Sequence, residues 1–160
     1  MIAKYPALTL EEYQRQRARL EKAVSELRAG GSFLQAIARA YYIVHATVAY
    51  AAAKHGITIV HTRQGHEVEE DVFTHNSIPD VLKALYTGNK SGRVRPGSTP
   101  GIGSGKLSAR TAERFVDMLQ RDRKYADYGP TRVLEPYSES VAGERLDWAH
   151  LIVQDLGALT

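Results

Sequence analysis

The chain has 160 residues, 21 lysines and arginines against 18 acidic residues, and no cysteine, which is ordinary for a globular protein and excludes a disulfide framework. No run of about 18 apolar residues is free of charge, and the first residues lack the apolar stretch of a signal peptide. We therefore expect a single cytoplasmic domain over residues 1–160 that packing alone holds together.

The first predicted element is an amphipathic helix over residues 10–29. Thr9 and Glu12 have the spacing of a capping box, and apolar residues follow at alternating steps of three and four. Gly30 ends the periodic stretch, as glycine commonly does at a helix C-terminus.

A second helix is predicted from Ser32, as its cap, to about Lys54. Its residues are apolar nearly all round. Such a helix belongs at the centre of a bundle or in a subunit interface.

Residues 57–106 form an irregular insert in this scheme. Residues 57–60 favour a short extended piece, residues 67–73 a helical turn or two, and Pro79 the first turn of a short helix. Residues 87–106 hold six glycines and two prolines, which predicts a long loop without regular structure.

Two further helices complete the expected fold. Ser108 caps one that continues to about Ala126, and Ser138 caps the last one. The sequence thus predicts an all-α protein, an antiparallel bundle of four to five helices with a long irregular insert between the second and later helices.

Basic residues are concentrated in the insert. Between Asp80 and Glu113 the chain has no acidic residue, which favours contact with a nucleic-acid backbone. The candidate RNA- or phosphate-binding residues are Lys90, Arg93, Arg95, Lys106 and Arg110.

The segment 101–106, Gly-Ile-Gly-Ser-Gly-Lys, partly resembles a P-loop. The template needs glycine where Pro100 stands and serine or threonine where Leu107 stands, so nucleoside-triphosphate binding by this route is not expected. Two interpretations of Lys106 remain: it holds a phosphate with nearby backbone amides, or it lies in a solvated surface loop.

His61, His66, Glu70 and His75 are close in sequence without the spacing of a metal motif. We interpret them as polar loop residues and expect neither a metal nor a cofactor.

Four tyrosines border the basic stretch or the late helix. Aromatic rings beside cations suit the stacking of single-stranded RNA bases, although tyrosine at helical spacing is also typical of simple packing. We expect stacking from at most one of Tyr86, Tyr125, Tyr128 and Tyr137.

Two segments resemble a known family. The second predicted helix contains Arg39-Ala-Tyr-Tyr, and the penultimate helix contains Arg123-Lys-Tyr-Ala-Asp-Tyr. In this order they resemble the Ser-Arg-Ala-Tyr-Tyr and Arg-x-x-Ala-Asp-Tyr signatures of short stand-alone HEPN proteins. The residues that carry the resemblance are Tyr41, Tyr42, Arg123, Asp127 and Tyr128.

This resemblance implies a helical bundle that dimerises and is associated with RNA. Many HEPN proteins are metal-independent ribonucleases of toxin–antitoxin, defence or mobile-element systems, and others are inactive modules that bind RNA or nucleotides. The implied partners are a second copy, RNA or a nucleotide, and a cognate antitoxin or nucleotidyltransferase.

The ribonuclease members carry arginine, often followed by Asn or Asp, with histidine after four to six residues. Arg121 and Asp122 begin this pattern, but Asp127 stands where histidine is expected. Asp127 is better explained as a structural residue that either pairs with Arg123 or caps neighbouring backbone, because an ionised carboxylate is a poor acid and repels phosphate.

Arg39 and His45 also fit the residue count. Six steps of about 100° leave His45 about 120° round the helix from Arg39. The candidate catalytic residues are therefore Arg39, His45, Arg121 and Asp122, and His45 can equally be a hydrogen-bonded core residue.

The resulting hypotheses belong to different classes. The chain binds RNA or cleaves it without metal; or it is a non-catalytic module for a nucleotide or partner protein; or it is a structural dimerisation protein.

Overall fold

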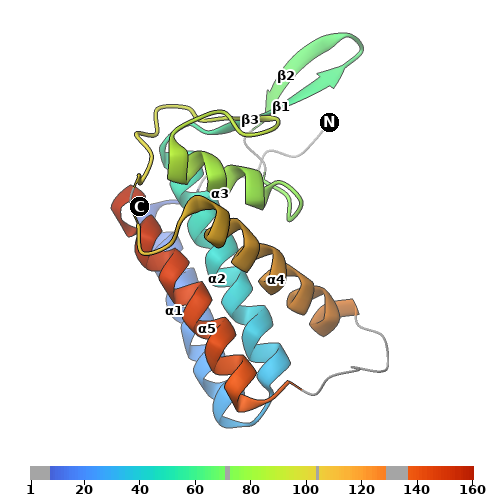
Figure 1. Ribbon diagram of the computed structural model, residues 1–160, viewed down its shortest axis with the longest axis vertical. Coiled ribbons are helices and arrows are strands. Elements are labelled where there is room, and N and C mark those ends of the chain that lie inside the picture. The colour runs from blue at the N-terminus through green and yellow to red at the C-terminus, as the bar shows by residue number, and fades with distance from the viewer. Residues whose placement is uncertain (1–7, 71–72, 104, 129–136) are drawn as a thin grey trace.

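The computed structural model describes residues 8–70, 73–103, 105–128 and 137–160. In these ranges the protein is mostly helical, with five α-helices and a small three-stranded sheet (Figure 1). The helices are α1 (Leu10–Ala29), α2 (Phe33–Lys54), α3 (Ile78–Thr87), α4 (Ala109–Tyr128) and α5 (Glu139–Leu156), and a 3-10 turn follows at Gly157–Leu159. The strands are β1 (Thr58–Arg63), β2 (His66–Glu70) and β3 (Val94–Arg95).

The predicted helices and most of their caps are confirmed. Thr9 and Glu12 form the capping box of α1. Ser108 and Ser138 accept backbone N–H bonds at the starts of α4 and α5. Ser32 precedes α2 but makes no side-chain capping bond.

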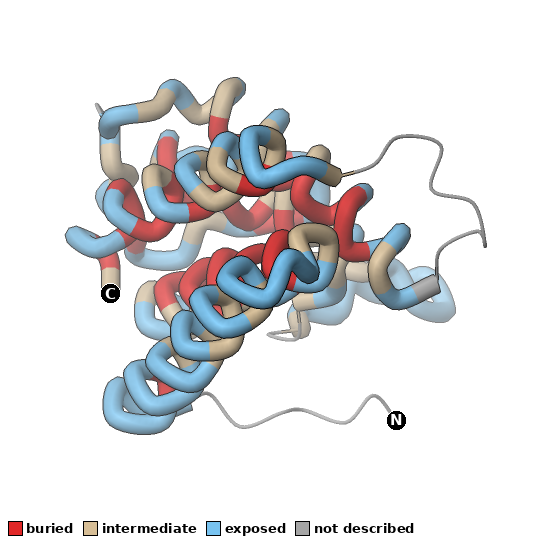
Figure 2. Tube along the Cα trace, turned by 90° about the horizontal axis from the view of Figure 1, so that it is seen from below, coloured by how far each residue is buried: buried red, intermediate tan, exposed pale blue. Residues whose placement is uncertain are grey.

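Helix α2 occupies the centre of the protein and packs against α1, α3, α4 and α5. Most of its residues are buried, which explains why its sequence is apolar nearly all round. Buried residues follow the faces that the helices turn toward one another (Figure 2). By contrast, the one buried residue of α1 is Tyr13, whose ring stacks on Tyr50 at 4.6 Å and whose hydroxyl bonds Thr47 at 2.7 Å.

The all-α prediction is wrong for the insert. Strands β1 and β2 form an antiparallel hairpin that stands away from the long helices (Figure 1). Ile59 of β1 pairs with Glu70 on one side and with Val94 of β3 on the other. The helical turn expected over residues 67–73 is thus a strand as far as Glu70, and the expected loop contains β3. Backbone pairing, which helical periodicity does not report, decides both: β2 pairs with the neighbouring β1 across a tight turn, and β3 pairs with β1 from further along the chain.

Gly97 brings the insert against the end of α2. Its φ is +60°, and a Cβ at this position would lie 2.2 Å from the backbone oxygen of His55. The Ser98 amide donates to the same oxygen at 2.8 Å. Glycine is required at residue 97 because both the left-handed backbone and the close approach exclude a side chain.

No helix among the described residues is long and apolar enough to cross a membrane.

Candidate functional site

The two segments that carry the family resemblance meet in space. The Tyr42 hydroxyl of α2 donates to Asp127 Oδ2 of α4 at 2.7 Å, and Gln35 Nε2 donates to the Ala126 backbone oxygen at 3.3 Å. Burial, followed by the hydrogen bond to Asp127, raises the pKa of Tyr42. The hydroxyl therefore stays protonated at neutral pH and remains a donor.

Arg123 lies next to Asp127 in this contact and is only 4% exposed. Its Nη1 is 3.6 Å from Asp127 Oδ2, so the predicted pairing of these residues at i and i+4 is confirmed. The Arg123 Cζ also lies 5.7 Å from the centre of the Tyr41 ring, within the range of a cation–π contact. The guanidinium is thus held between an aromatic ring of α2 and a carboxylate of its own helix.

A third segment adds His75, which precedes α3. Its Nδ1 is 2.8 Å from the Tyr41 hydroxyl, and its ring centre is 5.0 Å from that of His45. We call this group of six residues the α2–α4 polar cluster. Its members are Tyr41, Tyr42, His45, His75, Arg123 and Asp127.

Burial, and after it the nearby positive charge, favours neutral imidazoles in the α2–α4 polar cluster. Burial, then His75 and Arg123, lower the pKa of His45 to about 4. Burial also lowers the pKa of His75, with Arg123 and Lys124 acting in the same direction and Asp127 opposing them. Both rings are therefore neutral at neutral pH, and each can accept a proton.

Sequence reasoning did not identify His75 as a site residue. It lies 34 positions from Tyr41, its hydrogen-bond partner. No helical or strand period connects the two residues, so only the packing of the segment before α3 against α2 brings them together.

The catalytic candidates named from the sequence do not form one group. His45 belongs to the α2–α4 polar cluster, whereas Arg39 is exposed on α2. Arg121 is exposed on α4, and Asp122 is buried toward α5, where it accepts bonds from Tyr137 and Arg145 at 2.6 and 2.9 Å. Helix α4 presents Arg123 and Asp127 to α2, and not the pair Arg121 and Asp122.

The candidate RNA- or phosphate-binding residues also differ in whether they form ion pairs. Arg95 forms ion pairs with Glu67 and Glu69 of the β-hairpin. Lys90, Arg93 and Arg110 are exposed and, within the described ranges, form no ion pair. Solvent-borne phosphate can reach these three side chains, and it can also reach the exposed side chain of Lys106.

A carboxylate of α5 accepts hydrogen bonds from backbone amides at Lys106 and Leu107. The amides of Lys106 and Leu107 donate to Asp155 at 2.7 and 3.0 Å, and the Tyr86 hydroxyl donates to the same carboxylate at 2.5 Å. Gly105 permits this approach, since a Cβ there would lie 2.6 Å from Asp155 Oδ2. Of the two interpretations of Lys106, phosphate binding by these amides is not supported, because the amides already donate to Asp155. The Lys106 side chain itself is exposed.

Two of the four tyrosines that border the basic stretch or the late helix have structural roles. Tyr86 is buried and its hydroxyl donates to Asp155, and the Tyr137 hydroxyl donates to Asp122. Tyr125 is 42% exposed on α4, and the side chain of Tyr128 lies outside the described residues. Tyr125 is therefore the described tyrosine of this set that remains available for stacking.

The histidines of the insert do not gather around a common point. His61 lies 3.4 Å from Glu70 within the hairpin, whereas His75 contacts α2. Within the described part of the chain, no three His, Asp or Glu residues are grouped as metal ligands.

Comparisons of the chain with protein-family models, with curated proteins and with solved structures found no match. The function is therefore argued from the α2–α4 polar cluster and the exposed basic residues.

Proposed function

We propose that this chain is an RNA-associated protein of the HEPN type, folded as an antiparallel helical bundle, in which the α2–α4 polar cluster receives an RNA phosphate. The observation that carries the proposal is the convergence of both resemblance segments and His75 around the guanidinium of Arg123.

The charges around His75 support phosphate binding. Arg123 and Lys124 both act to lower the pKa of His75, and their effect opposes that of Asp127. This pattern indicates a positive potential at the imidazole in spite of the nearby carboxylate. A phosphate next to His75 would lie in that potential, and the exposed Arg39 would add a further cation on α2.

The exposed basic residues of the insert region extend the contact along an RNA backbone. Lys90, Arg93 and Arg110 are exposed. Phosphate contacts of this type position a nucleic acid without reading its sequence. The Tyr125 ring, on the same helix as Arg123, offers a face on which one unpaired base can stack.

A homodimer belongs to the same proposal. A second copy would extend the RNA-binding surface, and a cognate antitoxin or nucleotidyltransferase would regulate it in a toxin–antitoxin, defence or mobile-element system. These partners rest on the resemblance of the Arg39-Ala-Tyr-Tyr and Ala126-Asp-Tyr segments alone.

Fluorescence anisotropy with a labelled single-stranded RNA tests the proposal. We expect binding that weakens steeply as salt rises, because cations that contact phosphates release counterions. A triple variant with alanine at Lys90, Arg93 and Arg110 should bind more weakly and show a shallower salt slope. Arg39→Ala should also weaken binding, whereas Arg19→Ala, an exposed arginine of α1, serves as the matched control. RNA affinity that is absent at low salt, or equal in all variants, would contradict the proposal.

RNA cleavage without metal is a second candidate, and the neighbouring rings of His45 and His75 favour it. In this reaction the 2′-hydroxyl oxygen attacks phosphorus, and the bond to the 5′-oxygen breaks. A neutral His75 would accept the 2′-hydroxyl proton and return it to the leaving oxygen, while the positive potential of the buried Arg123 would stabilise the charge of the phosphorane. His75, being half-buried with its Nδ1 bonded to Tyr41, suits this role better than His45, whose pKa is about 4.

Incubation of the purified protein with RNA in EDTA distinguishes cleavage from binding alone. Cleavage should produce fragments that end in a 2′,3′-cyclic phosphate, and His75→Ala should abolish it while RNA binding persists. Equal cleavage by the wild type and by His75→Ala would assign the activity to a contaminant. An intact RNA that is nevertheless bound would favour the non-catalytic candidate.

A further inference from the structure

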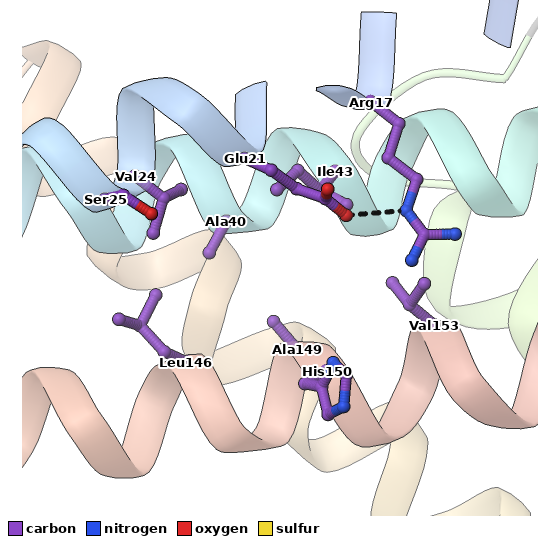
Figure 3. Close-up of a pocket in the computed structure, with 10 residues that line it drawn as sticks. All are labelled: Arg17, Glu21, Val24, Ser25, Ala40, Ile43, Leu146, Ala149, His150 and Val153. Atoms are coloured by element: carbon purple, nitrogen blue, oxygen red, sulfur yellow. Dashed lines mark hydrogen bonds and ion pairs between the residues drawn. The ribbon is translucent and has the colours of Figure 1, made fainter. Parts of the chain in front are cut away.

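A groove of about 380 Å³ lies between α1 and α5, with α2 as its floor (Figure 3). Helices α1 and α5 are separate neighbours of α2, and the small side chains of Ala40 and Ala149 leave space where the three helices face one another. Its apolar lining consists of Val24, Ala40, Ile43, Leu146, Ala149 and Val153.

This volume is within the range of small-molecule sites, which are about 300 to 1,000 Å³ and mostly apolar with a few polar groups. The groove follows α1 from Arg17 to Ser25, eight helical steps and therefore about 12 Å. Protein interiors are normally close-packed. An open apolar groove of this size therefore favours an occupant with an elongated apolar body.

Arg17 lies at one end of the groove and Ser25 at the other, with Glu21 between them (Figure 3). Arg17 extends from α1 toward Val153 of α5, and His150 of α5 lies beside Ala149 (Figure 3). The Arg17 Nε donates to Glu21 at 2.7 Å, while the terminal nitrogens of the guanidinium are turned toward α5. A guanidinium has five N–H donors, so Glu21 can orient Arg17 and still leave donors that face the groove.

We propose that the groove binds an amphipathic anion: an unbranched apolar chain of medium length that ends in a carboxylate. The chain lies over Ala40 and Ala149, and the carboxylate accepts hydrogen bonds from the terminal nitrogens of Arg17. Arginine suits this role because its planar fork matches the two oxygens of a carboxylate. The site uses α1 and α5 and does not depend on RNA binding at the α2–α4 polar cluster.

Isothermal titration of the full chain with decanoate, kept below its micelle concentration, tests this proposal. We expect saturable binding of one decanoate per chain. Arg17→Gln should weaken binding about tenfold to a hundredfold, the usual effect of losing a hydrogen bond to a charged group. Ala149→Leu, which fills the groove, should abolish binding. Arg19→Gln, an exposed arginine on the same helix, should bind as the wild type does.

Decanol, which has the same chain without the carboxylate, separates the two parts of the site. It should bind the wild type more weakly than decanoate does, and Arg17→Gln should not change its affinity. Thermal unfolding of each variant confirms that it is folded, and Ala40→Val is the second groove-filling variant if Ala149→Leu does not fold. The proposal is overturned if decanoate does not bind, if a folded groove-filling variant binds it normally, or if light scattering shows a dimer that the groove-filling variants dissociate.

Discussion

The Tyr42 hydroxyl of α2 and the Asp127 carboxylate of α4 share a 2.7 Å hydrogen bond across 85 residues of sequence. This bond connects the Arg-Ala-Tyr-Tyr and Ala-Asp-Tyr segments, so the two most distinctive parts of the sequence are one structural unit. Asp127 also forms an ion pair with Arg123 of its own helix at 3.6 Å, so it interacts with both helices. Asp127 thus holds α2 against α4.

Replacement of Tyr42 by phenylalanine removes this bond without removing the ring. We expect the free energy of unfolding to fall by about 1 kcal/mol, the usual net contribution of one hydrogen bond. Urea denaturation measures the change, and Tyr125→Phe, an exposed ring on α4, is the control. A stability equal to that of the wild type would show that Asp127 is satisfied by solvent and Arg123 alone.

Stability should fall between pH 6.5 and pH 4 because of His45. The pKa of this residue falls from 6.5 to about 4 on folding, chiefly through burial. The unfolded chain therefore binds the proton first, and the contribution of His45, fully present above pH 6.5, is lost as the pH falls through about 4. The loss is at most about 3 kcal/mol.

The comparison of the wild type with His45→Gln isolates this effect from the titration of carboxylates. Urea denaturation at several pH values should give a shallower decline of stability for the variant below pH 6.5. Identical slopes for the two proteins would show that His45 titrates normally in the folded state.

Asp155 should be the most sensitive carboxylate of the described core. It accepts bonds from the Tyr86 hydroxyl and from the amides of Lys106 and Leu107. Asp155→Asn places a side-chain NH₂ group against these hydroxyl and amide donors and removes the negative charge. We therefore expect the free energy of unfolding to fall by about 2 to 3 kcal/mol. Thermal and urea unfolding measure it. Asp147→Asn, on an exposed position of the same helix, should change stability by less than about 0.5 kcal/mol.

Two glycines of the insert should respond differently to alanine. Gly97 and Gly103 both have positive φ, but a Cβ at Gly97 would lie 2.2 Å from the His55 oxygen, whereas a Cβ at Gly103 meets nothing within 4 Å. We expect Gly103→Ala to lower the free energy of unfolding by about 1 kcal/mol through backbone strain alone. Gly97→Ala should cost clearly more, because the insert must also move away from α2. Equal losses in urea denaturation would mean that the insert contributes little to global stability.

The helices could be predicted because their signals are local. The capping box of Thr9 and Glu12, the caps at Ser108 and Ser138 and the apolar stripes all act within a few residues of the chain. The same local reasoning failed over residues 67–73. There, pairing of β2 with β1 outweighs any helical tendency, and strand pairing is set by tertiary context.

The candidate site was only partly accessible to such reasoning. Its two helical segments were identified from residue types and order, and the pairing of Arg123 with Asp127 follows from helical spacing alone. His75 was not identified, because its contacts with Tyr41 and His45 depend on how the segment before α3 returns to α2.

The sequence by itself determined the five helices and the two segments that bear the family resemblance, and it limited α2 to a bundle centre or a subunit interface, since each follows from periodicity, capping or composition. Only the tertiary structure decided that Tyr42 bonds Asp127, that His75 joins them, and that Asp155 occupies the amides beside Lys106. These contacts join residues between 34 and 85 positions apart. Their formation depends on the packing of whole helices, which no local pattern specifies.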